Sequence, residues 1–324
     1  MRKPTFAATA AVSQPLDQPR FLTDYSPRDR PWDVHRAQAQ AVEGFYRDAA
    51  FDALAGRIKG CTAYLGFVWS DPDPETGELR FKLRAARFCR VRHCPVCQWR
   101  RSLMWQARFL KALPVIEQAY PSARWLFLTL TVRNCPITDL RATIQSMNKA
   151  WHRLVAREEF GAVQGWVRTT EVTRGCDDSA HPHFHVLMMV RPSYFKKHYV
   201  RHERWVELWR ECARLNYRPT VDIRTVKPKP GKPEFALRRA ISETLKYTVK
   251  PSDLSGEWLI ELTRQVHRLR FVSSGGVLRD ILREGQETQE DLLVADDPSG
   301  GDDRGAGPEL FFDWQRQIKR YVKR

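Results

Sequence analysis

Apolar and polar residues alternate along several stretches in the middle of the 324-residue chain. In the first of them Leu126, Leu128 and Leu130 share one face, and this period of two predicts a β-strand. Two longer stretches carry apolar residues at helical spacing. The order strand, helix, strand, strand, helix, strand is typical of an α+β, ferredoxin-like or RRM-like antiparallel sheet with helices packed on it. The predicted strands cover residues 126–132, 166–173, 183–190 and 220–226, and the predicted helices cover 138–157 and 198–215.

The patterns on either side of this central stretch divide the chain further. We predict a helix over residues 32–58, a hairpin-like turn at 71–78, a basic helix from 98 to 113, and another helix over 233–249. The last residues are amphipathic and basic, which fits a short helix packed on the core, the interpretation we favour, or a contact with DNA. The predicted parts are a disordered N-terminus (1–30), a helix with a small zinc-binding module and the basic helix (31–118), the domain with the central sheet (119–274), an acidic flexible linker (275–308) and a basic C-terminal tail (309–324).

The chain is strongly basic, with 54 lysines and arginines against 38 aspartates and glutamates, a net charge of +16. An excess of positive charge favours a nucleic-acid partner, because each phosphate contact releases condensed counterions. A basic enzyme without such a partner is the alternative. The apolar runs at 125–130 and 186–190 are too short to cross a bilayer, and the first residues lack the pattern of a secretion signal. We therefore expect a cytoplasmic protein with no membrane partner.

Three of the seven cysteines, Cys89, Cys94 and Cys97, lie close together in the sequence. This clustering and the odd total argue against a disulfide framework and for a metal site in a reducing cytosol. The spacing of Cys94 and Cys97 suits a tetrahedral structural Zn²⁺, which would stabilise a module with little core of its own. Cys61 or His93 would supply the fourth ligand, and we favour Cys61 because His93 is adjacent to Cys94. Reduced cysteines without a metal are the alternative.

A basic, tryptophan-rich segment follows the cysteines directly, at residues 98–109. Its composition suits contact with single-stranded nucleic acid, in which Arg100 and Arg101 bind phosphates and the tryptophans stack on bases. A helix that packs its tryptophans inward fits the same composition equally well.

Three histidines alternate along the strand at 183–190 and just before it. His181, His183 and His185 share one face of a strand, close enough to converge on one metal ion. Glu171 is the carboxylate of the preceding predicted strand, so His183, His185 and Glu171 suit an open divalent site that acts as a Lewis acid. A histidine-rich edge strand with solvated imidazoles is the alternative.

The last predicted helix carries Glu243 and Tyr247 one turn apart, hence on one face. Lys246 and Lys250 form an adjacent positive face suited to DNA. A tyrosine beside cations and a metal loses its proton more readily and attacks a phosphodiester, and a nearby carboxylate activates that hydroxyl or a water. Taken alone, such a face is more often solvated surface.

Together, these segments resemble the HUH endonucleases, and among them the rolling-circle plasmid replication initiators with one catalytic tyrosine. The strength of the resemblance is the order of the motifs along the chain. The similar segments are RFCRVRHCPVCQWRRSL (87–103), FLTLTVRN (127–134), HPHFHVL (181–187) and ETLKYTVK (243–250).

The resemblance implies the HUH endonuclease fold for residues 119–274 and a role for each site residue. His183, His185 and either Glu171 or His181 would bind Mg²⁺ or Mn²⁺. Tyr247 would nick origin DNA, leaving a 5′-phosphotyrosine link and a 3′-OH primer. A glutamate at position 243, where related enzymes have a second tyrosine, would activate water at termination, when the DNA is rejoined.

Two other functions fit parts of the sequence. One is an HUH single-strand transposase or relaxase, and the other is a non-catalytic, zinc-stabilised nucleic-acid-binding protein. For the replication initiator the partners would be origin DNA, single-stranded or supercoiled, and a host helicase, since the chain has no ATP-binding GxxxxGK[ST] loop.

Overall fold

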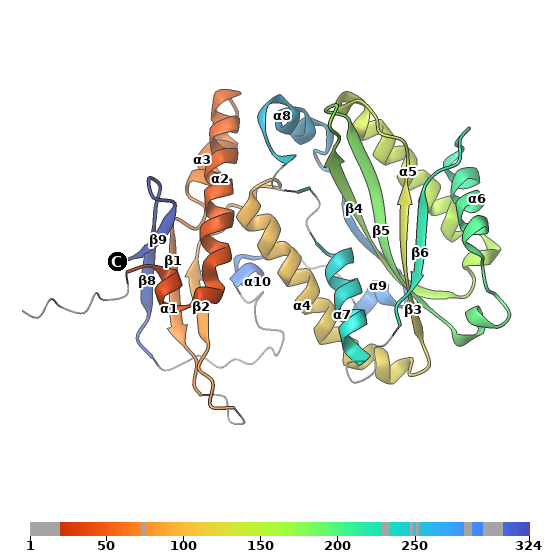
Figure 1. The fold of residues 1–324 in the computed structure, drawn as a ribbon, viewed down its shortest axis with the longest axis horizontal. Helices are drawn as coiled ribbons and strands as arrows, with labels where there is room; N and C mark the ends of the chain where they lie inside the picture. The colour runs from red at the N-terminus through yellow and green to blue at the C-terminus, as the bar shows by residue number, and fades with distance from the viewer. Residues whose placement is uncertain are drawn as a thin grey trace, which may run out of the picture.

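The computed structural model places the strands of the chain in two antiparallel sheets, of four and five strands among the described residues. Figure 1 shows one sheet on each side of the molecule, with helices α4 (Pro95–Ala119) and α7 (Pro233–Thr244) between them. This arrangement confirms the predicted α+β class. The structure describes residues 20–72, 76–227, 233–246, 249–250, 253–281, 287–293 and 307–324.

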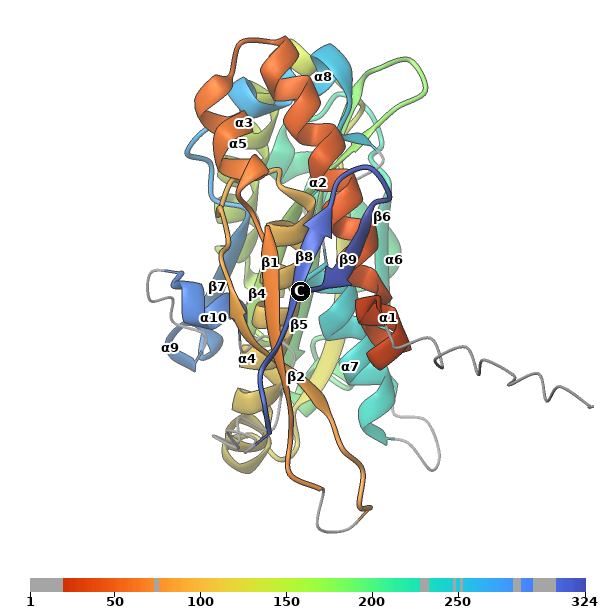
Figure 2. The same cartoon turned by 90° about the vertical axis from the view of Figure 1, so that its left-hand side faces the viewer.

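The four-stranded sheet combines segments from both ends of the chain, which lie side by side in Figure 2. The predicted hairpin around the turn at 71–78 is confirmed, since the strands that flank it pair in antiparallel fashion. In spatial order the strands are β2 (Phe81–Ala86), β1 (Tyr64–Trp69), β8 (Leu310–Gln315) and β9 (Arg320–Lys323).

The basic C-terminal tail forms β8 and β9, so the expectation of a short helix is wrong, although the tail does pack on the core. Phe312 and Trp314 are buried while Asp313 between them is partly exposed, which is the period of a strand. The main-chain N–H of Tyr321 donates to Asp33 Oδ1 at 2.9 Å. The two ends of the chain therefore stabilise each other.

Helices from the N-terminal part pack on the core of this sheet. Residues 20–29, expected to be disordered, are helical in part, whereas residues 1–19 lie outside the described residues. The single helix predicted over 32–58 is two helices, because Ala50 has a φ of 58°, and a left-handed residue ends a helix. The elements are α1 (Leu22–Tyr25), a 3₁₀ turn (Pro27–Asp29), α2 (Arg30–Asp48) and α3 (Asp52–Lys59).

Helix α4 is longer than the predicted basic helix, which was expected to end before Pro114. An interior proline costs about 3 kcal/mol. Leu113 and Ile116 are buried in the core beside the five-stranded sheet, and full burial of such side chains stabilises by about 1.5–3 kcal/mol each. This burial offsets the proline. Among the helices that the structure describes, α4 included, none combines the length and apolar character needed to span a membrane.

The five-stranded sheet contains the strands predicted from alternation, which are thereby confirmed. Helices α5 (Leu140–Val155) and α6 (His202–Ala213) occupy the predicted places in the chain order. Neighbouring strands are antiparallel throughout. In spatial order the strands are β6 (Val221–Thr225), β3 (Arg124–Thr131), β5 (Ala180–Val190), β4 (Val163–Arg174) and β7 (Val272–Gly276).

The two faces of this sheet bury alternate residues of β5. Phe184 and Val186 belong to a core shared with α5 and α6. Leu187 faces the other way and packs in a core shared with α4 and α7. His183 and His185 share the face of Leu187. The candidate site therefore lies on the side of the sheet that carries α4 and α7 (Figure 1).

Helix α7 ends at Thr244, earlier than the predicted end near Val249. Val249 instead forms an isolated parallel bridge with Val172 of β4. Pro251 disfavours helical backbone at Lys250, and a β-branched residue such as Val249 fits an extended segment better than a helix. Glu243 and Lys246 consequently do not share one continuous helix.

The segment after β7 was expected to be an acidic linker, and residues 282–286 and 294–306 of it lie outside the described residues. The part between them packs on α4, with Leu292 fully buried. The remaining elements are α8 (Gly256–Gln265), α9 (Leu278–Ile281), α10 (Gln289–Leu293) and 3₁₀ turns at Ile137–Asp139, Glu158–Phe160 and Pro192–Phe195.

Tyr321 tests whether the C-terminal strands belong to the core. Its fully buried hydroxyl donates to the main-chain carbonyl of Thr62 at 2.7 Å. Tyr321→Phe leaves that carbonyl without this donor, so we expect a loss of about 1–3 kcal/mol in the free energy of unfolding. Urea unfolding followed by circular dichroism measures the change.

Tyr199→Phe is the matched control, because it removes the same atom from a side chain that is 61% exposed. We expect it to change the free energy of unfolding by less than about 0.5 kcal/mol. Equal unfolding midpoints for the two variants would contradict a structural role of the C-terminal strands.

Candidate functional site

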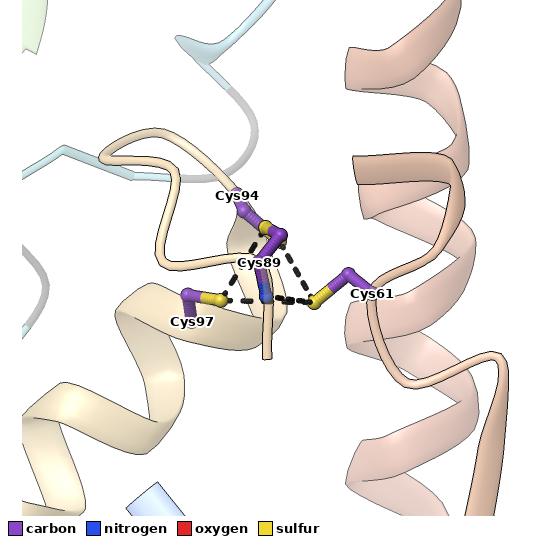
Figure 3. A group of neighbouring side chains, drawn as sticks. All are labelled: Cys61, Cys89, Cys94 and Cys97. Carbon is purple, nitrogen blue, oxygen red and sulfur yellow. Dashed lines mark hydrogen bonds between the residues drawn. The ribbon is translucent and has the colours of Figure 1, made fainter. Parts of the chain in front are cut away.

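Four cysteine side chains meet between the four-stranded sheet and the start of α4, and Figure 3 shows them pointing toward one another. Cys97 Sγ lies 3.6 Å from the Sγ atoms of Cys61 and Cys89. Cys94 Sγ lies 3.7 Å from Cys61 Sγ. A tetrahedral Zn²⁺ with bonds of about 2.3 Å places its sulfurs about 3.8 Å apart. This cysteine cluster therefore has the dimensions of a four-sulfur metal site.

The thiols of the cysteine cluster influence one another's ionisation. Hydrogen bonds from Cys61, Cys94 and Cys97 lower the pKa of Cys89. The hydrogen bond with Cys89 raises the pKa of Cys61, and burial raises the pKa of Cys94. One thiolate is thus stabilised by its protonated neighbours. A bound divalent cation favours the thiolate form of all its ligands, which is the chemistry that this set of donors suits.

His93, the alternative fourth ligand, is not part of the cysteine cluster. Its imidazole is buried, and burial together with the charges of Arg92 and Arg101 lowers its pKa to about 3. Neither ring nitrogen has a hydrogen-bond partner in the part of the chain that the structure describes. The structure thus brings Cys61, the ligand favoured from the sequence, together with the other three.

Glu171, His183 and His185 form a second group, here called the histidine cluster. The antiparallel register of β4 and β5 places Glu171 opposite His183 and Thr169 opposite His185. Because residues two apart on a strand share a face, the carboxylate and both imidazoles point to the same side of the sheet. All three side chains are buried.

The separations of the nitrogen and oxygen atoms suit one metal ion. Glu171 Oε2 lies 2.9 Å from His185 Nε2 and 3.3 Å from His183 Nε2. Neighbouring ligands of an octahedral ion with bonds of about 2.1 Å are about 3 Å apart. His183 Nδ1 donates to the main-chain carbonyl of His181, and His185 Nδ1 lies 3.2 Å from Thr129 Oγ1. These contacts orient the rings so that each Nε2 faces Glu171 Oε2, and a divalent cation would take the place of the protons between them.

Glu171 is ionised although it is only 2% exposed. Burial alone would raise its pKa, but hydrogen bonds from His183 and His185 and the charges of His183 and Lys246 hold the pKa of Glu171 well below its usual range. A buried carboxylate that keeps its charge is a competent ligand for a hard divalent cation.

His181 does not belong to the histidine cluster, in which the ligand atoms of Glu171, His183 and His185 all lie within 4.8 Å of one another. The centres of the His181 and His183 rings are 5.1 Å apart, and it is the main-chain oxygen of His181 that contacts His183.

Thr129 was not predicted as a site residue. Its position on the alternating strand at 126–132 places it opposite His185, and that alternation was the signal that would have found it.

Lys246 connects the histidine cluster to α7. Its Nζ lies 3.1 Å from Glu171 Oε2 and 2.7 Å from Glu243 Oε1. Burial would lower the pKa of Lys246, but the hydrogen bond to Glu243 and the charge of Glu171 raise it overall. Glu243 is exposed and reaches Glu171 through this ammonium group. Tyr247, the predicted nucleophile, lies outside the described residues.

The residues predicted to bind DNA differ in exposure. Arg100 is fully buried, and its Nε donates to the main-chain carbonyl of Leu292 at 2.8 Å, so the expectation that it contacts DNA disagrees with its position. The side chain of Arg101 is 23% exposed and pairs with Glu287. Lys250 is exposed. Arg101 and Lys250 remain available to a polyanion where Arg100 is not.

Known proteins resemble this chain over most of its length. A family model described as replication protein matches residues 80–322. The chain belongs to the replication protein family. It is 32% identical to Protein rep of Streptococcus pneumoniae serotype 2 (strain D39 / NCTC 7466) over 94% of this chain and 96% of that protein. It is 33% identical to Protein rep of Bacillus amyloliquefaciens over 92% of this chain and 93% of that protein. No solved structure matches the chain significantly.

Membership of the replication protein family confirms the resemblance to rolling-circle plasmid replication initiators that the motifs indicated. The matched range includes the histidine cluster and three of the four clustered cysteines, while Cys61 precedes it. The alignment with the Streptococcus pneumoniae protein covers nearly all of both chains, so the likeness is not confined to one module.

Cys94→Ser tests the cysteine cluster. It removes one of four sulfur ligands, and a site with three holds a divalent ion more weakly. We expect the purified, desalted variant to contain about one equivalent of metal less than the wild type. Elemental analysis by mass spectrometry measures the content.

Cys176→Ser is the matched control, since Cys176 is exposed and lies outside the cysteine cluster. This variant keeps the metal content of the wild type. An equal metal content in the two variants would show that the metal is bound elsewhere or not at all.

Proposed function

We propose that this replication protein starts rolling-circle replication of a plasmid by nicking one strand of origin DNA through Tyr247 and rejoining the strand at the end. The observation that carries the proposal is the buried histidine cluster on the inner strands of the five-stranded sheet. The order β6-β3-β5-β4 supports it, because a split βαβ sheet of the ferredoxin-like type has its strands in this order, as expected of an HUH endonuclease.

The histidine cluster has the donor set for Mg²⁺ or Mn²⁺, with His183 and His185 as nitrogen ligands and Glu171 as an oxygen ligand. Such an ion, when bound, polarises the scissile phosphate. Lys246 adds a positive charge beside the histidine cluster, where an ion pair with Glu171 holds its ammonium group. The cysteine cluster is a separate, closed set of sulfur donors that suits structural Zn²⁺.

The residues on either side of Tyr247 support its role as the nucleophile. Lys246 contacts Glu171, and Val249 bridges to Val172, the next residue of β4. In the proposed reaction the phenolic oxygen of Tyr247 forms a bond to phosphorus while the bond between phosphorus and the 3′ oxygen breaks. The products are a 5′-phosphotyrosine link and a 3′-hydroxyl that primes replication.

Glu243 is the proposed base for termination. Its carboxylate is 49% exposed and accepts a hydrogen bond from Lys246, whose ammonium group also contacts Glu171. A partly exposed carboxylate that is linked to the histidine cluster through Lys246 suits activation of a water molecule, which then attacks the phosphotyrosine. The protein then needs no second tyrosine.

Tyr247→Phe removes only the phenolic oxygen. We expect the variant to lose the covalent adduct with origin DNA and the relaxation of supercoiled origin plasmid, both to background, because no other group replaces the nucleophile. Denaturing electrophoresis with a labelled origin strand, in Mg²⁺ or Mn²⁺, measures the adduct.

Tyr199→Phe, the exposed tyrosine used above, serves again as the control and forms the adduct at the wild-type rate. An adduct that persists in Tyr247→Phe would remove Tyr247 from the mechanism. A wild-type protein that binds origin DNA and forms no adduct would instead indicate the non-catalytic DNA-binding protein.

Glu243→Gln keeps the size of the side chain and removes its basicity. We expect nicking to remain within a few-fold of the wild type, while release of the covalent intermediate slows by about 10²-fold or more, as is typical when a general base is lost. A time course of adduct decay after a chase with unlabelled DNA measures release. Wild-type decay in this variant would refute the role of Glu243.

A further inference from the structure

A cavity of about 380 Å³ lies beside the histidine cluster, within the range of about 300–1,000 Å³ that is common for ligand sites. Helix α4 contributes Arg101 and Trp105 to its wall, the segment after α7 contributes Lys246, and the segment before β7 contributes Arg270. Because Lys246 also contacts Glu171, this cationic pocket borders the candidate site.

The cationic pocket carries an excess of positive charge. Glu287 is the one acidic side chain among the described residues that line it. Burial and the charge of Arg101 lower the pKa of Arg92 to about 10, so like charges are crowded here. Crowded cations with few acids favour a bound polyanion. The cations are Arg90, Arg92, Arg101, Lys246 and Arg270.

The carboxylate of Glu287 already occupies an anion position in the cationic pocket. Arg101 donates to it from Nε at 2.5 Å and from Nη2 at 3.0 Å. This fork of two donors binds two oxygens of a carboxylate or of a phosphate in the same way. The guanidinium of Arg101 is therefore oriented to receive a phosphate in place of Glu287.

Aromatic side chains complete the cationic pocket. Trp105 and Phe271 both line it, and the guanidinium of Arg92 lies 4.8 Å from the centre of the Phe271 ring. Aromatic faces combined with cations are typical of sites for single-stranded nucleic acid, whose bases are free to stack on a side chain. In a duplex the bases are paired and stacked on each other, so they do not enter such a pocket.

We propose that the cationic pocket binds one nucleotide of the single DNA strand next to the phosphate at the histidine cluster, with its phosphate on Arg101 and Arg270 and its base against Trp105. That the bound strand is DNA rests on the proposed function. The nucleotide replaces the Glu287 carboxylate, so the wild-type chain binds the strand less tightly than a chain that lacks this carboxylate.

The test is binding of a fluorescein-labelled oligothymidylate to the full chain without added divalent cation, followed by fluorescence anisotropy. We expect Arg270→Ala to raise the Kd about tenfold and to lower the slope of log affinity against log salt by about 0.7. We expect Glu287→Gln to lower the Kd several-fold, a gain that a misfolded variant does not produce.

Arg210→Ala is the matched control, since it removes the same charge from α6 on the opposite face of the sheet, where the side chain is 44% exposed. Its Kd stays at the wild-type value. The absence of either expected change overturns the proposal. So does an equal effect of Arg270→Ala on an oligothymidylate–oligoadenylate duplex.

Adduct formation by Tyr247 is measured separately. No adduct, together with the expected changes in affinity, would end the nicking proposal and leave the cationic pocket supported. An adduct with unchanged affinities in Arg270→Ala and Glu287→Gln would overturn the pocket alone.

Discussion

The buried charge of Glu171 is the constraint on which the candidate site depends. A carboxylate that is 2% exposed is tolerated only where hydrogen bonds and opposite charges compensate it. His183 and His185 supply this compensation from the neighbouring strand, and Lys246 supplies it from the segment after α7. Compensating one buried charge therefore also places Lys246, the residue that precedes Tyr247, beside the histidine cluster.

Helix α4 is the second constraint, because it runs from the cysteine cluster to the core beside the five-stranded sheet. It starts at the cysteine cluster and ends in the core beside the five-stranded sheet, where Leu113 and Ile116 are buried. Along its length it contributes Arg101 and Trp105 to the cationic pocket. The cysteine cluster therefore lies at the start of the same helix that carries Arg101 and Trp105.

The two clusters differ in the chemistry that their donors allow. Four sulfurs at tetrahedral separations form a closed set, typical of a structural site. Two imidazoles and a carboxylate leave positions open, as a site that contacts substrate requires. The histidine cluster borders the cationic pocket through Lys246, so the proposed site of nicking and the proposed site of strand binding adjoin in space.

The sequence by itself determined what depends on neighbours along the chain. Alternation predicted the strands and the shared face of His183 and His185, and spacing predicted the cysteine cluster, since local periodicity follows from backbone geometry. The tertiary structure decided what depends on residues far apart. Arg100 is buried in the core, pairing with β1 places the C-terminal tail in a sheet, and the register of β4 against β5 places Glu171 opposite His183. Such outcomes depend on which distant surfaces bury one another, and no local pattern encodes that.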